Sequence, residues 1–230
     1  MSEIKVCCTS GAAAIGYAAE YLRDAGVDVT DAMASDVTHL LLPVPTLCFD
    51  ALPPGVVIVG GNLHSLPGFD TIDLLKDPEY LAQNAAITAR CAIALIGKEL
   101  KGLPVLILGW GRIGKCLTKF LGYAGADVTV AARNPADIAM VRALGYSGAA
   151  IDTVSPLLPK FGAVLNTVPA MVLPAFRCAP DCVLLELASR PGMAGPGIIN
   201  GRGLPGKYAP EESGALIARR FLALVKEGQT

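Results

Sequence analysis

Three glycines between two apolar runs constrain the fold of this chain more than any other feature. The first run covers 105–108, a helical pattern reaches Tyr123, and a second apolar run covers 128–130. Between the first run and the helical pattern stands a G-x-G-x-x-G motif made of Gly109, Trp110, Gly111, Arg112, Ile113 and Gly114. This order predicts a strand, a helix and a parallel strand, which is the unit that opens a Rossmann dinucleotide-binding domain.

Each glycine of the motif has a physical task in such a unit. Gly109 permits the tight turn from strand to helix, Gly111 lets the backbone approach a pyrophosphate, and Gly114 lets helix and strand pack closely. The helix N-terminus adds free N–H groups and a partial positive charge for the phosphates. The alternative is a glycine-rich turn in an α/β domain that binds no ligand.

The end of the second strand bears on the choice of dinucleotide. Sites that prefer NAD usually place Asp or Glu about 20 residues after the glycines, where it accepts from the ribose 2′-OH. Here Arg133 and Asn134 follow the strand, and the first carboxylate is Asp137. A guanidinium can pair with a 2′-phosphate and stack on adenine, and Asn134 can add a donor. The pattern favours NADP over NAD, with Arg133 as a solvated loop residue being the alternative.

The composition predicts buried parallel strands and an interface between copies of the chain. The chain has 230 residues, 53% of them hydrophobic and 17% charged, with a mean hydropathy of +0.51. No apolar run approaches the length of about 18–20 residues that a membrane span needs. The apolar surplus therefore predicts strands covered on both faces and an interface between copies, so we expect a homo-oligomer and no membrane insertion.

Charge, cysteines and histidines exclude several classes of function. The net charge of −1 comes without a basic cluster, which argues against nucleic-acid binding. The seven cysteines form no C-x-x-C pair and the chain has only two histidines, so we expect free thiols and no metal site. The start of the sequence lacks the layout of a signal peptide. A reducing, cytoplasmic location is expected.

Alternating strand and helix patterns predict an α/β protein with two domains. Residues 1–79 are expected to form a smaller N-terminal α/β lobe, in which 61–79 reads as an irregular loop. Residues 80–210 are expected to form the Rossmann domain, beginning with a helix at 80–97. The last helix, 211–227, is expected to pack back on the first lobe.

Three later loops place polar groups where a dinucleotide site needs them, because the carboxyl ends of parallel strands meet at one edge of a sheet. Asn166, Thr167 and Pro169 follow an apolar run and are expected to contact the nicotinamide end of the cofactor. The next apolar run is followed by a loop with a carboxylate, a hydroxyl and a guanidinium, which are Glu186, Ser189 and Arg190. A turn with Gly203, Pro205 and Gly206 precedes the last helix. Taken singly, each loop also reads as an ordinary turn.

Taken together, these segments resemble the family of the dipicolinate synthase A subunit over about residues 80–226. The matching segments are GWGRIGK, AARN, LNTVPA, LELASRPG and GLPGKYAP, with Gly214 beyond them. The resemblance implies a two-lobe fold similar to 2-hydroxyacid dehydrogenases. It also implies NADP-linked oxidation of dihydrodipicolinate, or of its hydroxylated tetrahydro precursor, to dipicolinate in spore-forming bacteria. The partner that it implies is a flavoprotein-like B subunit.

Site roles for a small carboxylate substrate follow from this resemblance. Thr88, Asn166 and Thr167 would position the nicotinamide or the ring nitrogen, while Ser189, Arg190 or Arg90 would bind carboxylates. Glu186 is either a proton acceptor or a structural partner of Arg190. Two segments depart from the family: Thr88-Ala89-Arg90-Cys91 replaces Thr-x-Glu-Gly, and Glu211-Glu212 replaces Lys-Thr.

Other functions remain open from the sequence. The same cofactor site suits an NADP-dependent dehydrogenase of another small carboxylic acid, because the changed loops bear on the substrate. It also suits a redox sensor or regulatory subunit that binds NADP without turnover. A purely structural α/β domain would bind no dinucleotide.

Overall fold

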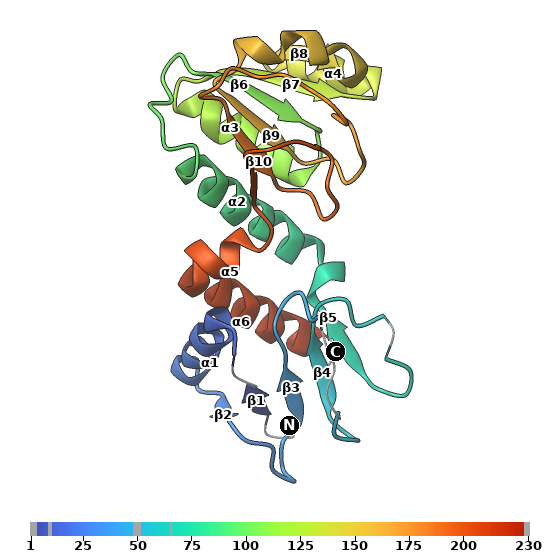
Figure 1. The fold of residues 1–230 in the computed structure, drawn as a ribbon. Coiled ribbons are helices and arrows are strands. Elements are labelled where there is room, and N and C mark those ends of the chain that lie inside the picture. The colour runs from blue at the N-terminus through green and yellow to red at the C-terminus, as the bar shows by residue number, and fades with distance from the viewer. Residues whose placement is uncertain (1–3, 9–10, 48–51, 65, 228–230) are drawn as a thin grey trace. The chain divides into compact units, whose positions relative to one another are not determined.

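The computed structural model describes residues 4–8, 11–47, 52–64 and 66–227. The chain divides into two compact units, one formed by Met1–Ile87 with Pro205–Thr230 and the other by Thr88–Leu204. Each unit contains one parallel sheet with helices (Figure 1), which confirms the predicted α/β class. The division falls inside helix α2 (Pro78–Ala94) rather than before it.

The second unit contains a six-stranded parallel sheet in the order β11-β10-β9-β6-β7-β8. Read from β8, this is the 3-2-1-4-5-6 order of the Rossmann fold, whose direction reverses between β6 and β9. Ligands bind such sheets at the carboxyl ends of the strands beside that reversal. The strands are β6 (Pro104–Leu108), β7 (Asp127–Ala132), β8 (Ser147–Ala150), β9 (Ala163–Asn166), β10 (Val183–Glu186) and β11 (Ile198–Asn200).

Two helices that follow β6 and β7 begin at the ligand-binding edge. Helix α3 (Arg112–Tyr123) buries one side, and the Oγ1 of Thr118 on that side donates to the carbonyl of Gly114 at 2.8 Å. Helix α4 (Pro135–Ala143) starts with a side-chain cap, because the Oδ1 of Asn134 accepts from the N–H of Ala136 at 2.9 Å. Of the two, α4 is thus capped by a side chain at the end that faces the site.

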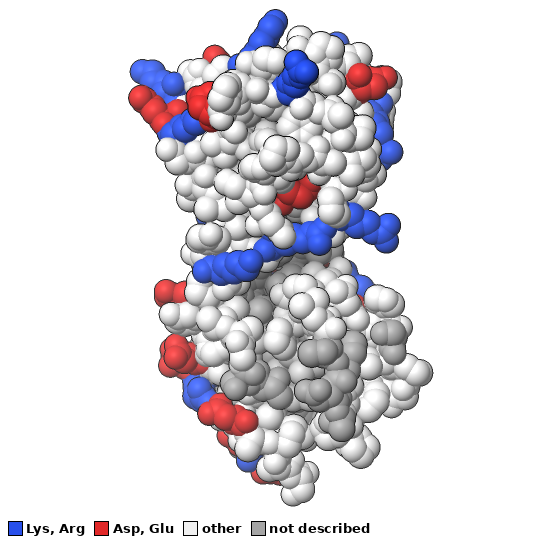
Figure 2. All heavy atoms as spheres, viewed as in Figure 1, with Lys and Arg blue, Asp and Glu red and all other residues white. Residues whose placement is uncertain are grey.

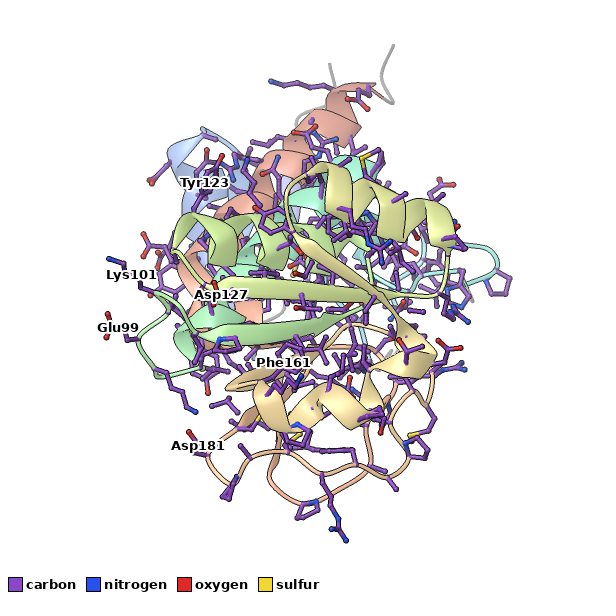
Figure 3. All side chains as sticks on the ribbon, turned by 90° about the horizontal axis from the view of Figure 1, so that it is seen from above. Glu99, Lys101, Tyr123, Asp127, Phe161 and Asp181 are labelled. Atoms are coloured by element: carbon purple, nitrogen blue, oxygen red, sulfur yellow. The ribbon has the colours of Figure 1, made fainter. Side chains whose placement is uncertain are left out.

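At the amino ends of the strands, opposite the ligand-binding side, a lysine links two neighbouring strands. The Nζ of Lys98 donates to the carbonyl of Gly162 at 3.3 Å and to the carboxylate of Asp181 at 3.0 Å. These partners lie just before β9 and β10, so Lys98 ties together the amino ends of two neighbouring strands. Figure 3 labels Asp127, Phe161 and Asp181, which mark the edge where β7, β9 and β10 begin.

The first unit contains a five-stranded parallel sheet in the order β2-β1-β3-β4-β5. Fully buried Val6, Leu41 and Ile58 form part of its core. The helices of this unit are α1 (Ala13–Asp24), the short α5 (Leu204–Tyr208), most of which belongs here, and α6 (Pro210–Glu227). The strands are β1 (Lys5–Cys8), β2 (Asp28–Thr30), β3 (His39–Leu41), β4 (Val57–Gly60) and β5 (Thr71–Asp73).

Helices α1 and α6 cross closely because small residues line the contact. A Cβ atom at Gly214 of α6 would lie 2.5 Å from the carbonyl oxygen of Ala14 and 2.6 Å from the Cβ of Tyr17. Only glycine permits this approach without a shift of the backbone. Gly214, which belongs to the family pattern in the sequence, therefore has a packing role.

Short elements escaped the sequence patterns. The pattern of 61–79 predicts an irregular loop, but the segment contains β5 and a 3₁₀ turn at Leu74–Lys76. The Asp73 carboxylate holds this segment by accepting hydrogen bonds from the N–H groups of Asn62, Leu63 and Leu75. Strands β5 and β11 are three residues long, which is too short to show an alternating pattern.

The six cysteines among the described residues are free thiols, while Cys48 lies outside those residues. Burial raises the pKa of the Cys182 thiol to about 12, and that of Cys8 to about 11. Much of the face shown in Figure 2 carries neither basic nor acidic side chains. Among the described residues, no helix is long and apolar enough to cross a membrane.

Candidate dinucleotide-binding site

A pocket of about 630 Å³ lies at the carboxyl ends of β6, β7 and β9. Its position is the one that the reversal of strand order assigns to a ligand in this fold. The loop after β6 forms one side, the start of α4 another, and the loop after β9 a third. Its lining residues are Gly109, Trp110, Gly111, Ala132, Arg133, Asn134, Asp137, Ile151, Thr167, Val168 and Pro169.

Two glycines of the motif are required by packing alone. Gly109 has a φ of +101°, and a Cβ there would lie 2.5 Å from the Oγ1 of Thr167. A Cβ at Gly114 would collide with the carbonyl oxygen of Gly109. These two positions would therefore be glycine in this turn whether or not a ligand binds.

Gly111 differs, because nothing in the protein requires a glycine there. Its φ of −79° suits any residue, and a Cβ would meet no atom within 4 Å. Gly111 also lines the pocket. A missing side chain at this point gains nothing for the fold, but it lets a ligand reach the backbone.

Helix α3 presents its N-terminus beside Gly111. Gly111 is its N-cap residue and makes no side-chain cap, and no acidic residue stands in the first turn. The first N–H groups of a helix have no partner within it and carry a partial positive charge. The Nζ of Lys115 lies 5.8 Å from the centre of the Trp110 ring, which places a cation and an aromatic face at the same loop.

The side of the pocket formed after β7 and at the start of α4 carries one cation and one carboxylate. Arg133 is exposed directly after β7, and Asp137 stands in the first turn of α4. Both line the pocket. Asn134 lies between them, and its Oδ1 caps the helix.

Thr167 joins the wall of the pocket to the first strand. Its Oγ1 donates to the carbonyl of Leu108 at 2.8 Å, and its backbone N–H donates to the same carbonyl at 2.9 Å. The loop after β9 is thereby fixed against the turn at Gly109. The predicted residues Thr167 and Pro169 both line the pocket.

Asn166 and Glu186 lie behind this wall rather than in it. Asn166 is fully buried and Glu186 is 5% exposed, and neither lines the pocket. The Nδ2 of Asn166 donates to Glu186 at 2.7 Å and to the carbonyl of Val168 at 3.0 Å. The sequence predicted a nicotinamide contact for Asn166, but its side chain points into the protein because it closes the turn of its own loop. A catalytic role for Glu186 stays a prediction.

The remaining motif residues, Arg112 and Ile113, do not line the pocket, and neither does Gly114. Arg112 is the first residue of α3 and is exposed, whereas Gly114 is buried against the turn. Backbone N–H groups rather than side chains are what this part of the helix offers a phosphate.

The predicted substrate residues are dispersed. Ser189 and Arg190 are exposed in the loop after β10, and Gly203 is exposed with a φ of +68°. The guanidinium of Arg90 lies 5.9 Å from the ring centre of Phe120, beside the middle of α3. Thr88 is buried in α2, and Pro205 and Gly206 belong to the other unit. None of the seven predicted residues lines the pocket.

Four lining residues were not predicted as ligand contacts. Ala132, Ile151 and Val168 are apolar and gave no chemical signal, although each follows or ends a strand at the ligand edge. Asp137 stood out in the sequence only as the first carboxylate after β7. The N-cap pattern Asn134-Pro135 was a usable signal, because it places Asp137 in the first turn of a helix that starts at this edge.

Comparisons with known proteins agree with the motifs. No family model matches the chain. The sequence is 29% identical over 153 residues to the A subunit of dipicolinate synthase from Bacillus subtilis, a match that covers 62% of this chain and about half, 52%, of that relative.

Solved structures share the fold over nearly the whole chain. The A subunit of dipicolinate synthase from Bacillus halodurans has a TM-score of 0.80 at 20% identity, covering 96% of this chain and 97% of that one. Its counterpart from Bacillus subtilis has a TM-score of 0.79 at 21% identity, covering 100% and 98%. The resemblance predicted from the motifs is confirmed: the chain is similar to the A subunit of dipicolinate synthase in sequence and in fold.

Proposed function

We propose that this chain binds NADP⁺ in the pocket between Gly109 and Pro169 and acts as an oxidoreductase. The open space at Gly111 carries the proposal, because a glycine without a structural reason marks a close approach by a ligand. When bound, the nicotinamide supplies hydride transfer. The N-terminus of α3 would hold the pyrophosphate, and Thr167 and Pro169 would bound the site at the loop after β9.

Arg133 would select the 2′-phosphate of NADP⁺. Its guanidinium is exposed at the pocket rim, where a planar group can pair with two phosphate oxygens. Asp137 faces the same pocket and favours the other cofactor, because a carboxylate accepts from a ribose 2′-OH and repels a 2′-phosphate. NAD⁺ is therefore the second candidate.

We propose dihydrodipicolinate, or its hydroxylated tetrahydro precursor, as the substrate, which would be oxidised to dipicolinate. Support comes from the series of motifs and from the similarity to the A subunit of dipicolinate synthase. Ser189 and Arg190 are exposed after β10 and suit a carboxylate, because a hydroxyl donates and a guanidinium pairs bidentately. Thr88 and Arg90 stay predicted contacts for the ring and its carboxylates.

The same resemblance supports the B subunit of such a synthase as the partner. The apolar surplus of the sequence supports a homo-oligomer as the assembly of this chain. Two competing proposals keep the same cofactor site: a dehydrogenase of another small carboxylic acid, and an NADP-binding regulator without turnover. Oxidation of dihydrodipicolinate in the presence of a B subunit separates both from the main proposal. The regulator would bind NADP⁺ and oxidise no carboxylic acid offered.

The cofactor proposal is tested by fluorescence. Trp110 is the only tryptophan of the chain and lies in the glycine loop, so its emission reports on the pocket directly. We expect NADP⁺ to change this emission at lower concentrations than NAD⁺. Arg133→Ala should weaken NADP⁺ binding by about tenfold, the effect of losing one charged hydrogen-bonding partner.

Asp137→Asn serves as the matched variant at the same rim. If NADP⁺ is the cofactor, Asp137→Asn leaves its affinity unchanged or improves it, because a negative charge beside the 2′-phosphate is removed. The NAD⁺ alternative would be established by two results together: Asp137→Asn weakens NAD⁺ binding, and Arg133→Ala leaves NADP⁺ binding unchanged. Binding of neither dinucleotide would contradict an oxidoreductase of this type.

A further inference from the structure

We infer that Glu186 is a positioning residue that locks two loops of the second unit together, and that it does not accept a proton in the reaction. The inference rests on the proposed function in one respect, since one of these loops is a wall of the proposed NADP⁺ pocket. The other loop carries Ser189 and Arg190, the proposed contacts for substrate carboxylates.

Four N–H groups occupy the Glu186 carboxylate. Its Oε1 accepts from the Nδ2 of Asn166 at 2.7 Å and from the N–H of Ala188 at 3.1 Å. Its Oε2 accepts from the N–H groups of Gly192 at 2.8 Å and Met193 at 3.2 Å. An ionised carboxylate is an acceptor only, so it matches this set of donors. Arg190, the partner considered from the sequence, is not among them.

The donors come from two separate loops. Asn166 ends β9, and its side chain also bonds both backbone groups of Val168, a residue of the pocket wall. The N–H groups of Ala188, Gly192 and Met193 belong to the loop after β10. Through one carboxylate, the wall at 166–169 and the loop at 188–193 are held in a fixed relation.

Gly192 adds a second contact between the same loops. A Cβ there would collide with the Nδ2 of Asn166 and would lie 2.8 Å from the carbonyl oxygens of Val168 and Ala170. Its own carbonyl accepts from the N–H groups of Val172 and Leu173. The two loops therefore pack backbone against backbone around the Asn166–Glu186 hydrogen bond.

This burial is unsuited to proton transfer with a substrate. Glu186 is 5% exposed, does not line the pocket, and has both oxygens engaged. A proton on either oxygen would face two N–H donors, and a buried donor without an acceptor is costly. Both oxygens are thus engaged in holding the two loops, which is what a fixed positioning group requires.

Glu186→Gln tests the inference, because it keeps the shape and replaces one oxygen by an NH₂ group that faces two N–H donors. Amide hydrogen exchange is measured over the whole chain. We expect exchange at both 166–169 and 188–193 to rise by about tenfold. A rise confined to one loop, or none in either, would overturn the inference.

Lys98→Met is the matched control, because Lys98 ties the amino ends of the same two strands. It should raise exchange near 162 and 181 and leave the two loops unchanged. An equal rise in the loops in Lys98→Met would also overturn the inference, since any loosening of the sheet would then suffice. If Glu186→Gln does not fold, Asn166→Ala is measured instead. It removes the one donor that links the Glu186 carboxylate to the loop at 166–169, so exchange should rise both there and at 188–193. Unchanged exchange at 188–193 in Asn166→Ala would overturn the inference.

The affinity for NADP⁺, measured by Trp110 emission, distinguishes a positioning role of Glu186 from a purely stabilising one. A variant that only lowers the stability of the fold should still bind NADP⁺ with unchanged affinity. Glu186→Gln should weaken binding at least about fivefold, and Lys98→Met should leave it within about twofold. Unchanged binding in Glu186→Gln would refute a role in positioning the pocket wall. If the unmodified chain binds no NADP⁺, the proposed function fails, while the exchange experiment still decides whether Glu186 links the loops.

Discussion

The guanidinium of Arg220 in α6 holds the carboxylate of Asp77, which caps the start of α2. The Nε of Arg220 donates to Oδ2 of Asp77 at 2.5 Å, and its NH1 group donates to Glu79 at 2.6 Å. Asp77 also accepts from the N–H groups of Glu79 and Tyr80. One arginine of the last helix thus fixes the start of a helix that lies far earlier in the chain.

Arg220→Met should destabilise the first unit by about 2 kcal/mol, because it leaves the Asp77 carboxylate buried without its cation. Denaturant unfolding at pH 7 measures this. Arg219→Met is the control, since Arg219 is exposed on the same helix turn and should cost less than about 0.5 kcal/mol. Equal effects of the two variants would contradict a specific role for the Asp77 contact.

The same pair predicts a loss of stability in acid. Burial alone would raise the pKa of Asp77, but Arg220 and the N–H groups of Glu79 and Tyr80 outweigh it, so the pKa lies below its usual value. A carboxyl with a lowered pKa contributes stability above its unfolded value of about 3.9 and loses it as the pH falls further. The stability difference between wild type and Arg220→Met should therefore shrink below about pH 4. A constant difference down to about pH 2 would contradict this linkage.

His39 should give a second pH-dependent step. Its ring lies edge-on to Phe221 with centres 5.4 Å apart, and burial lowers the pKa of the imidazole. The unfolded chain then binds the proton more readily, so stability falls as the pH drops below about 6.5. His39→Leu should flatten the slope between about pH 7 and 5. His64, the other histidine, is exposed, and His64→Gln should keep that slope.

Gly214→Ala should destabilise the crossing of α1 and α6 by about 1–3 kcal/mol, the usual cost of forcing atoms into a packed contact. Gly16→Ala in α1 is the control, because a Cβ there meets no atom within 4 Å. It should stabilise the helix by about 0.5–1 kcal/mol. Thermal unfolding of both variants separates close packing from helix propensity. A stabilising Gly214→Ala would mean that the helices do not approach as described.

Strong local signals made the second unit predictable. The glycine motif and the apolar runs each depend on a few adjacent residues, and the strand, helix and strand that they predicted are β6, α3 and β7. Short edge strands such as β5 and β11 were missed because pairing with a neighbour, rather than their own sequence, makes them strands. The hydrogen bonds that Asp73 accepts from distant N–H groups are likewise a tertiary effect.

Side-chain direction was the main limit on predicting the site. Asn166 and Thr167 are neighbours in the sequence, yet Thr167 lines the pocket and Asn166 is fully buried behind it. Successive residues at a strand end point to opposite sides, so a pattern finds the loop without assigning each side chain. The guanidinium of Arg90 made it a candidate for binding carboxylates, but the sequence could not say where the side chain lies. Its contact with the Phe120 ring depends on how the helices pack.

The measurement that tests the central claim most directly is NADP⁺ affinity of the wild type and of Gly111→Ala, followed by Trp110 emission. The added Cβ meets no protein atom within 4 Å, so Gly111→Ala should unfold within about 0.5 kcal/mol of the wild type. Its affinity for NADP⁺ should fall at least about tenfold, because the proposal places the pyrophosphate against the backbone of Gly111 and the added methyl group would obstruct that approach. Equal affinities, or no binding by the wild type, would contradict the proposal that this pocket holds a dinucleotide.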